Sequence, residues 1–196
     1  MMPVIGVTGS FGTGKTTVAN LFTRFGAKVI DADALVHHEL KQNKKIIKKI
    51  TSAFGRDILD KKNQIDRNKL GEKVFRDKKK LDRLTRIVHP KIISLIKSEI
   101  KNNKKEVLVI DAPLLIEAGL QGLVDYLIVV KLSKGKQILR LKKKYNLSED
   151  ELLRRIKAQL PLSRKVRLAR FVIDNKGSLG QTESEVKKIW QQIIIK

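Results

Sequence analysis

The sequence of 196 residues contains no cysteine, only four prolines and few aromatic residues, which make up 5% of the chain. Without cysteine it can form neither a disulfide framework nor a cysteine-ligated metal site. No charge-free apolar run approaches the length of a membrane span, and no signal-peptide pattern precedes the first apolar segment. We therefore expect one cytoplasmic domain with no membrane partner, a monomer or small homo-oligomer, long enough to bury a substantial core.

Acidic residues are also scarce, at 20 against 43 lysines and arginines, which gives a net charge of +23. Such an excess can indicate nucleic-acid binding, because cationic surfaces attract phosphate backbones. The lysine clusters, however, are scattered along most of the chain among apolar residues of helical spacing, and stacking aromatics are few. We predict no specific nucleic-acid partner, although a positive field would also help to recruit a polyanionic small substrate.

The most informative stretch runs from Gly9 to Thr17 and reads GSFGTGKTT, between an apolar run and an amphipathic segment. Strand, glycine-rich loop and helix in this order are the context of a phosphate-binding loop. Glycines let backbone N–H groups converge on an anion, and the following helix N-terminus adds donors and the positive end of its dipole. We expect Lys15 to contact the terminal phosphates and the Thr16 hydroxyl to bind Mg²⁺. The other candidate phosphate contacts are Gly9, Ser10, Gly12, Thr13, Gly14 and Thr17.

Four further apolar runs predict strands, at about residues 27–31, 107–111, 126–130 and 171–174. Helical patterns lie between them, and the block at about 34–105 is longer than a crossover needs, so we interpret it as a substrate-binding insertion. Capping patterns predict helix starts after Asp66, at Ser148 with Glu151, and at Thr182 with Glu185. Strands that alternate with helices indicate an α/β fold with a doubly wound, five-stranded parallel sheet.

Polar side chains follow several of these strands, at Asp31, Asp33, Asp111 and Asn175. Ligands of parallel sheets bind beyond the carboxyl ends of the strands, so these residues are candidates for one crevice. Asp33 could accept a proton from an acceptor hydroxyl, or could cap a helix that begins at Ala34. Asp111 could hold Mg²⁺ through water or simply end a strand. Asn175 could be a turn residue or border an adenine ring.

Together these segments resemble the dephospho-CoA kinase family. The resemblance rests on the phosphate loop with Val29-Ile-Asp-Ala-Asp33, and on downstream motifs that include Ile65-Asp-Arg-Asn-Lys-Leu70, Ile87-Val-His-Pro90 and Pro113-Leu-Leu-Ile-Glu117. It continues through Gln137-Ile-Leu-Arg140, Arg155-Ile-Lys-Ala-Gln159 and Val172-Ile-Asp-Asn-Lys-Gly177, and so covers nearly the whole chain in order.

The resemblance implies transfer of the ATP γ-phosphoryl group to the ribose 3′-hydroxyl of dephospho-CoA. It implies that Asp33 is the base, that Lys15 and Arg140 act in catalysis, and that Arg140 belongs to a mobile lid at about 136–167. The core would then comprise about 1–33, 106–135 and 168–196, and the helical insertion would bind CoA. The substrate-binding residues implied are Asp33, His89, Leu115 and Glu117, and the nucleotide contacts include Asn175.

Alternatives remain at several of these positions. Arg140 lies in a basic helix whose charges are mostly solvated, and His89 before Pro90 could serve only to close a helix. Lys144 stands where the family often has a second lid arginine, and we find no account for Arg170 where an acid is common. The rival functions are a P-loop kinase acting on another nucleotide or nucleoside, and a nucleic-acid-binding ATPase.

Overall fold

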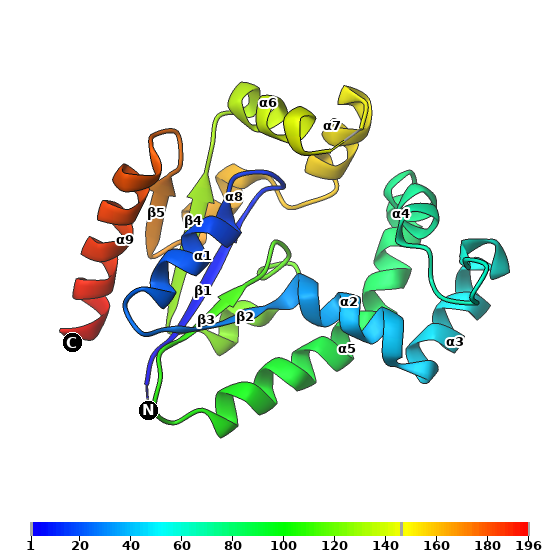
Figure 1. Cartoon of the computed structure of the whole chain (residues 1–196), viewed down its shortest axis with the longest axis horizontal. Coiled ribbons are helices and arrows are strands. Elements are labelled where there is room, and N and C mark those ends of the chain that lie inside the picture. Colours follow the sequence, from blue (N-terminus) through cyan, green and yellow to red (C-terminus); the bar gives the residue numbers. More distant parts are fainter. Residues whose placement is uncertain (1, 146, 196) are drawn as a thin grey trace. The chain divides into compact units, whose positions relative to one another are not determined.

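The computed structural model describes residues 2–145 and 147–195. Within them it confirms the predicted α/β fold: a five-stranded sheet in which every pairing is parallel, with strand order β2-β3-β1-β4-β5 (Figure 1). The strands are β1 (Val4–Gly9), β2 (Lys28–Asp31), β3 (Leu108–Asp111), β4 (Tyr126–Lys131) and β5 (Phe171–Asp174).

The chain folds into two compact units. The first unit, residues 1–31 and 97–196, contains the sheet, and the second comprises residues 32–96. Helices of the first unit are α1 (Lys15–Thr23), η2 (Leu120–Leu123), α6 (Lys134–Lys144), α7 (Glu149–Lys157), α8 (Leu162–Leu168) and α9 (Leu179–Ile194). The second unit holds α2 (Ala32–Gln42), α3 (Lys44–Phe54), η1 (Arg56–Ile58), α4 (Arg67–Phe75) and most of α5 (Lys78–Asn102).

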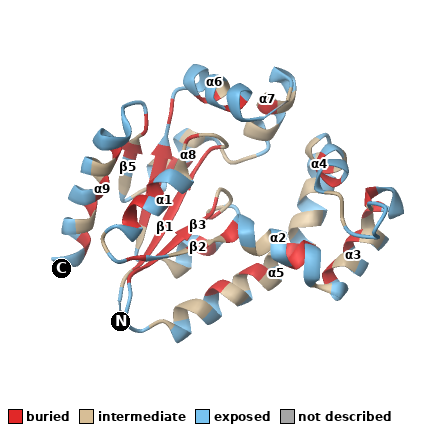
Figure 2. Ribbon diagram, in the orientation of Figure 1, coloured by how far each residue is buried: buried red, intermediate tan, exposed pale blue. Residues whose placement is uncertain are grey.

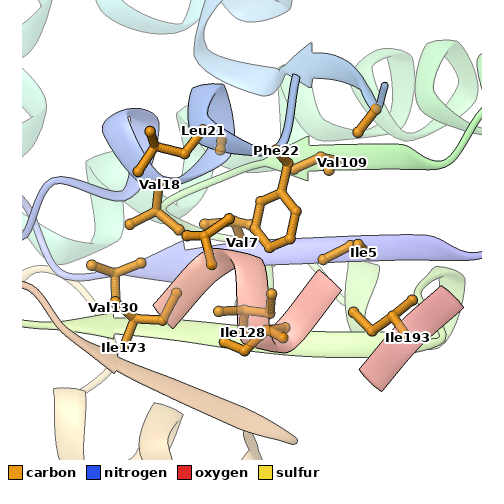
Figure 3. Packing of buried hydrophobic residues seen from close by; sticks show 14 of the residues in the cluster. Ile5, Val7, Val18, Leu21, Phe22, Val109, Ile128, Val130, Ile173 and Ile193 are labelled. Carbon is orange, nitrogen blue, oxygen red and sulfur yellow. The ribbon is translucent and has the colours of Figure 1, made fainter. Parts of the chain in front are cut away.

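The core of the first unit lies where α1 and α9 cover one face of the sheet (Figure 3). Phe22 of α1, which is fully buried, packs there with strand residues such as Ile5 and Ile128. On the opposite face Leu108 and Ile110 are also buried, so the central strands run through protein on both sides (Figure 2). This explains the continuous apolar runs, because a parallel sheet covered on both faces has no solvent-facing alternation.

Strand register brings the predicted polar residues to one edge of the sheet. Asp111 at the end of β3 is the register partner of Val7 in β1 and of Asp31 in β2. On the other side of β1, Gly9 pairs with Val130 of β4, and Lys131 pairs with Asp174 of β5. The carboxyl ends of the strands therefore place the GSFGTGKTT loop beside Asp111, the position at which such sheets bind ligands.

The predicted helix boundary at His89 and Pro90 is wrong. Helix α5 runs without interruption through Pro90, so His89 does not close a helix. A proline inside a helix removes one backbone hydrogen bond and costs about 3 kcal/mol. Val88, Ile92 and Ile96 recur on one face and are buried, and this packing offsets the cost.

Two further differences, one boundary and one unpredicted helix, lie in the C-terminal third of the chain. Helix α9 begins at Leu179, not at Thr182, because Ser178 and Gln181 form the capping box. The short helix α8 was not predicted, since Pro161 ends the previous pattern and the segment is rich in charge. The predicted capping box of Ser148 and Glu151 and the predicted N-cap at Asp66 are confirmed.

Candidate active site

The phosphate loop has the backbone that its glycines predict. Gly12 and Gly14 have φ of 84° and 89°, in the left-handed region that residues with a Cβ rarely adopt. An added Cβ at Gly12 would lie 2.6 Å from the Leu141 side chain, and one at Gly14 would lie 2.1 Å from Asn175 Nδ2. Both positions therefore need glycine for close approach as well as for conformation. Thr16 and Thr17, in the first turn of α1, are exposed.

Side chains from α6 and from the end of α7 hold the tip of this loop. The Gln137 amide of α6 donates to Ser10 Oγ at 3.0 Å and to the Phe11 carbonyl. Gln159, just after α7, accepts a hydrogen bond from the Phe11 N–H at 2.9 Å. The Phe11 and Tyr145 rings meet with 5.5 Å between centroids. The segment predicted as a lid thus contacts the loop that it would cover.

Asn175 is more than a turn residue, because its buried side chain connects the loop to the C-terminal helix. Its Nδ2 donates to the Thr13 carbonyl at 2.8 Å, and its Oδ1 accepts from the Thr182 hydroxyl at 3.0 Å. Its own main-chain carbonyl accepts a hydrogen bond of 2.9 Å from Arg140 Nη2. The Arg140 side chain is exposed, and this hydrogen bond holds it beside Asn175, whose side chain contacts the phosphate loop.

The oxygen donors predicted for Mg²⁺ are Thr16 and Asp111. Asp111 is 2% exposed at the edge of the sheet, in register beside β1. The described residues contain no group of three or more His, Asp or Glu side chains suited to a metal. A hydroxyl and one carboxylate nevertheless fit Mg²⁺, because this ion usually takes one or two protein oxygens and completes its shell with phosphates and water. The metal role of both residues stays a prediction.

The loop after β3 carries the two other substrate candidates of the first unit. Leu115 is fully buried under Gly6, so a ligand contact from it would have to come from its main chain. Glu117 accepts a hydrogen bond from the Leu160 N–H at 2.8 Å and forms an ion pair of 2.8 Å with Lys165 of α8. Lys165 also donates to the Pro113 carbonyl at 2.5 Å. Glu117 therefore links this loop to the segment that returns from α7.

Lys165 is a residue that the sequence analysis missed. It is fully buried, and burial lowers the pKa of its ammonium group, an effect that the Glu117 carboxylate partly offsets and Lys15 increases. Its hydrogen bond to the Pro113 carbonyl places it near the end of β1, because the Thr8 hydroxyl of β1 donates to the same carbonyl. No sequence signal distinguishes it among 43 basic residues. For Gln137 and Gln159 the sequence contains only a weak indication of a functional role, because they are uncharged polar residues in a lysine-rich stretch.

Asp33 and His89 belong to the second unit. Asp33 is exposed in the first turn of α2, which begins at Ala32, so the alternative that it caps a helix beginning at Ala34 is wrong. His89 lies half-buried in the middle of α5. Their predicted contacts with the acceptor stay predictions.

The phosphate loop lies between β1 and α1, at the carboxyl edge of a five-stranded parallel sheet, and a basic helical segment packs on its tip. This is the architecture of a P-loop kinase. Comparison with known proteins narrows this class. Residues 3–181 match the family model described as dephospho-CoA kinase. A dephospho-CoA kinase of Carboxydothermus hydrogenoformans is 39% identical over 195 residues, covering 98% of this chain and 95% of that protein. The chain belongs to the dephospho-CoA kinase family.

Solved structures agree with this assignment. The crystal structure of a Thermus thermophilus protein superimposes with a TM-score of 0.81 at 30% identity, over 98% of each chain. Dephospho-CoA kinase from Campylobacter jejuni gives a TM-score of 0.62 at 29% identity, over 98% of this chain and 97% of that one. No helix formed by the described residues is both long and apolar enough to cross a membrane.

Proposed function

We propose that this protein transfers the γ-phosphoryl group of ATP to the ribose 3′-hydroxyl of dephospho-CoA and releases CoA and ADP. Membership of the dephospho-CoA kinase family supports this activity, because the family match and the similarity to the Carboxydothermus hydrogenoformans kinase extend over nearly the whole chain. The observation that carries the proposal is the connected series from Arg140 through Asn175 to Thr13, because it brings a guanidinium group to the phosphate loop. A loop that only bound nucleotide would not need a cation supplied from a separate helical segment.

On the nucleotide side, the main-chain N–H groups of the loop and the N-terminus of α1 bind the β- and γ-phosphates. Lys15 and Arg140 balance the negative charge on the γ-phosphoryl oxygens as the bond to ADP lengthens. Gln137 and Gln159 keep the loop tip fixed, so that its donors are already oriented when the nucleotide binds.

On the acceptor side, the Asp33 carboxylate takes the proton of the ribose 3′-hydroxyl. The hydroxyl oxygen forms a bond to the γ-phosphorus at the same time. The bond from that phosphorus to the β,γ-bridging oxygen breaks, and ADP leaves with the electron pair. When bound, Mg²⁺ would neutralise negative charge on the phosphate oxygens, and Thr16 and Asp111 would be the residues that hold it. Covering of the site by the α6–α7 segment excludes water that would otherwise hydrolyse ATP.

An ADP-release assay tests the proposal. The purified protein is mixed with ATP, Mg²⁺ and one of three candidates: dephospho-CoA, a panel of nucleosides and nucleoside monophosphates, or DNA. We expect turnover that requires dephospho-CoA and yields one CoA for each ADP. Turnover with nucleosides or with DNA, and none with dephospho-CoA, would overturn the proposal.

A further inference from the structure

One buried charged group of the first unit takes no part in the proton and phosphoryl transfers: the ammonium group of Lys165. This side chain, on α8, is fully buried, although lysine is almost never fully buried unless it is paired. Its Nζ donates to the Pro113 carbonyl at 2.5 Å and forms an ion pair of 2.8 Å with Glu117 Oε1. Both partners belong to the loop that follows β3, so one side chain from α8 holds this loop at two points.

Stability alone does not account for a charge in this position. Removing an ammonium and a carboxylate from water costs several kcal/mol for each ion, and apolar side chains of similar volume often stabilise a protein as well as a buried ion pair does. An apolar side chain cannot, however, donate to the Pro113 carbonyl and the Glu117 carboxylate together and so fix where they lie. The buried lysine therefore indicates a requirement for a defined geometry of the loop after β3.

The first of these contacts reaches the base of the phosphate loop. Thr8, the fully buried residue of β1 that directly precedes the GSFGTGKTT loop, donates from its hydroxyl to the same Pro113 carbonyl at 3.3 Å. Asp111 lies two residues before Pro113 and is the register partner of Val7 in β1. The position of the Pro113 carbonyl therefore helps to set how the end of β3 lies against the end of β1.

The second contact reaches the tip of the phosphate loop through the segment that returns from α7. Glu117 Oε1 also accepts a hydrogen bond of 2.8 Å from the Leu160 N–H. The preceding residue, Gln159, accepts a hydrogen bond of 2.9 Å from the Phe11 N–H. The pair of Lys165 and Glu117 is thus connected to the phosphate loop at both its base and its tip.

Resting on the function proposed above, we propose that Lys165 is a positioning residue for phosphoryl transfer, which together with Glu117 fixes the loop after β3 against the base and the tip of the phosphate loop. Glu117 acts through Lys165 and the Leu160 N–H, and not by contact with the acceptor. Phosphoryl transfer depends mainly on alignment and charge stabilisation, and a displacement of about 1 Å can cost about 10²-fold in rate. Loss of the pair therefore lowers kcat and leaves the affinity for both substrates nearly unchanged.

The test is a double-mutant cycle of Lys165→Met, Glu117→Gln and the variant with both changes. We expect Lys165→Met to lower kcat about 10- to 100-fold, and Glu117→Gln about three- to tenfold because its amide oxygen can still accept from the Leu160 N–H. The double variant should be about as slow as Lys165→Met alone, since both changes break the same connection. The KM for dephospho-CoA and the ATP affinity from calorimetry should stay within about threefold of wild type.

Lys73→Met is the matched control. Lys73 also donates to a backbone carbonyl, that of Phe54 at 2.6 Å, and pairs with a carboxylate, that of Asp57 at 2.6 Å, but both partners belong to the second unit. Ile193→Ala, at a buried position of α9, is the control for lost stability. Both variants should keep kcat within about twofold of wild type at a temperature at which circular dichroism shows every variant to be folded.

Three kinetic results would overturn the positioning role. They are effects on kcat that multiply in the double variant, a loss in Ile193→Ala as large as that in Lys165→Met, and a raised KM for dephospho-CoA with unchanged kcat in Glu117→Gln. The last result would mean that Glu117 contacts the acceptor directly. If Lys165→Met does not fold, Glu117→Gln alone decides: a lower kcat at unchanged KM supports the proposal, and an unchanged kcat overturns it.

The same proteins distinguish this proposal from the proposed function. If the wild-type protein turns over dephospho-CoA and Lys165→Met has the kcat of Lys73→Met, the positioning role is wrong and the function stands. If the wild-type protein shows no turnover, hydrogen–deuterium exchange decides whether Lys165 fixes the loop. The N–H groups of Leu115, Ala118 and Leu120 are hydrogen-bonded within residues 112–120, so their exchange reports on the order of this segment. Exchange there at least about tenfold faster in Lys165→Met than in Ile193→Ala would support the proposal, and equal exchange would overturn it.

Discussion

At the scale of single residues, Asn175 connects the phosphate loop to two other elements of the site, α6 and α9. Its side-chain amide joins the loop to α9, and its carbonyl holds Arg140. Sequence reasoning favoured a turn residue, because an Asn before Lys-Gly after a strand is typical of turns. The long-range bond to Thr13 could not be predicted, since it depends on the order of the strands and not on local pattern.

Asn175→Ala should lower the free energy of unfolding by about 1–3 kcal/mol, because it leaves the Thr13 carbonyl and the Thr182 hydroxyl without this partner. It should also raise the KM for ATP several-fold, because the phosphate loop loses one of its anchors. Urea denaturation and steady-state kinetics measure the two effects. Asn20→Ala, on the exposed side of α1, is the control and should show neither. If Asn175→Ala is as stable as that control, the anchoring role is wrong.

Two glycines with positive φ, Gly14 in the phosphate loop and Gly26 after α1, allow backbone strain to be separated from steric clash. Gly14 and Gly26 have similar φ values of 89° and 93°, but a Cβ would meet Asn175 Nδ2 at 2.1 Å in the first case and nothing within 4 Å in the second. Both alanine substitutions should therefore cost about 1–2 kcal/mol of stability from the left-handed backbone.

Gly14→Ala should additionally abolish measurable ATP binding, since either Asn175 or the loop must move. Calorimetric titration with ATP, alongside denaturation, checks the pair. Equal ATP affinity in Gly14→Ala and Gly26→Ala would contradict the account of the loop.

At the scale of elements, α8 and its buried lysine change how the lid region is understood. Glu117 binds both the Leu160 N–H and Lys165, while the neighbouring Gln159 binds the phosphate loop. The segment between α7 and α8 is thus fixed at two points of the first unit. Sequence patterns predicted α6 and α7 through their amphipathic spacing and the Ser148 box, but they missed α8, whose buried position is occupied by a charge.

The buried ammonium of Lys165 predicts a pH dependence of stability. Burial lowers its pKa in the folded protein below the ordinary 10.5, whereas the unfolded chain keeps the ordinary value. Between the two values the unfolded state binds more protons, so the free energy of unfolding rises with pH. We expect the stability difference between wild type and Lys165→Met to grow in favour of wild type as the pH is raised towards 10.5.

Glu117→Gln sharpens this test. The Glu117 carboxylate raises the pKa of Lys165, so its removal should start the same rise at lower pH. Urea denaturation across a pH series measures all three proteins. A stability difference that is independent of pH, or that shrinks as the pH rises, would contradict the assignment of a buried, charged Lys165.

At the scale of the whole molecule, the fold could be predicted from sequence more fully than the site could. Five apolar runs that alternate with helices, together with the GSFGTGKTT loop, were sufficient for the parallel sheet, because burial on both faces leaves a plain signature in each strand. The residues that hold the loop come from distant segments, such as Gln137, Gln159 and Asn175, and only the tertiary fold brings them together. The net charge of +23 did not help to locate the site, because the sequence does not distinguish a functional lysine from a lysine on the solvent-facing surface.

The central claim is that Asp33 acts on the acceptor and not on the nucleotide. The most direct test compares wild type and Asp33→Asn in the rate of CoA formation from dephospho-CoA and ATP, with ATP affinity measured separately by titration. The account predicts a loss of about 10²–10⁴ in kcat with ATP affinity within about twofold of wild type, because removal of a general base leaves the phosphate loop intact. An Asp33→Asn protein that forms CoA at the wild-type rate would contradict it.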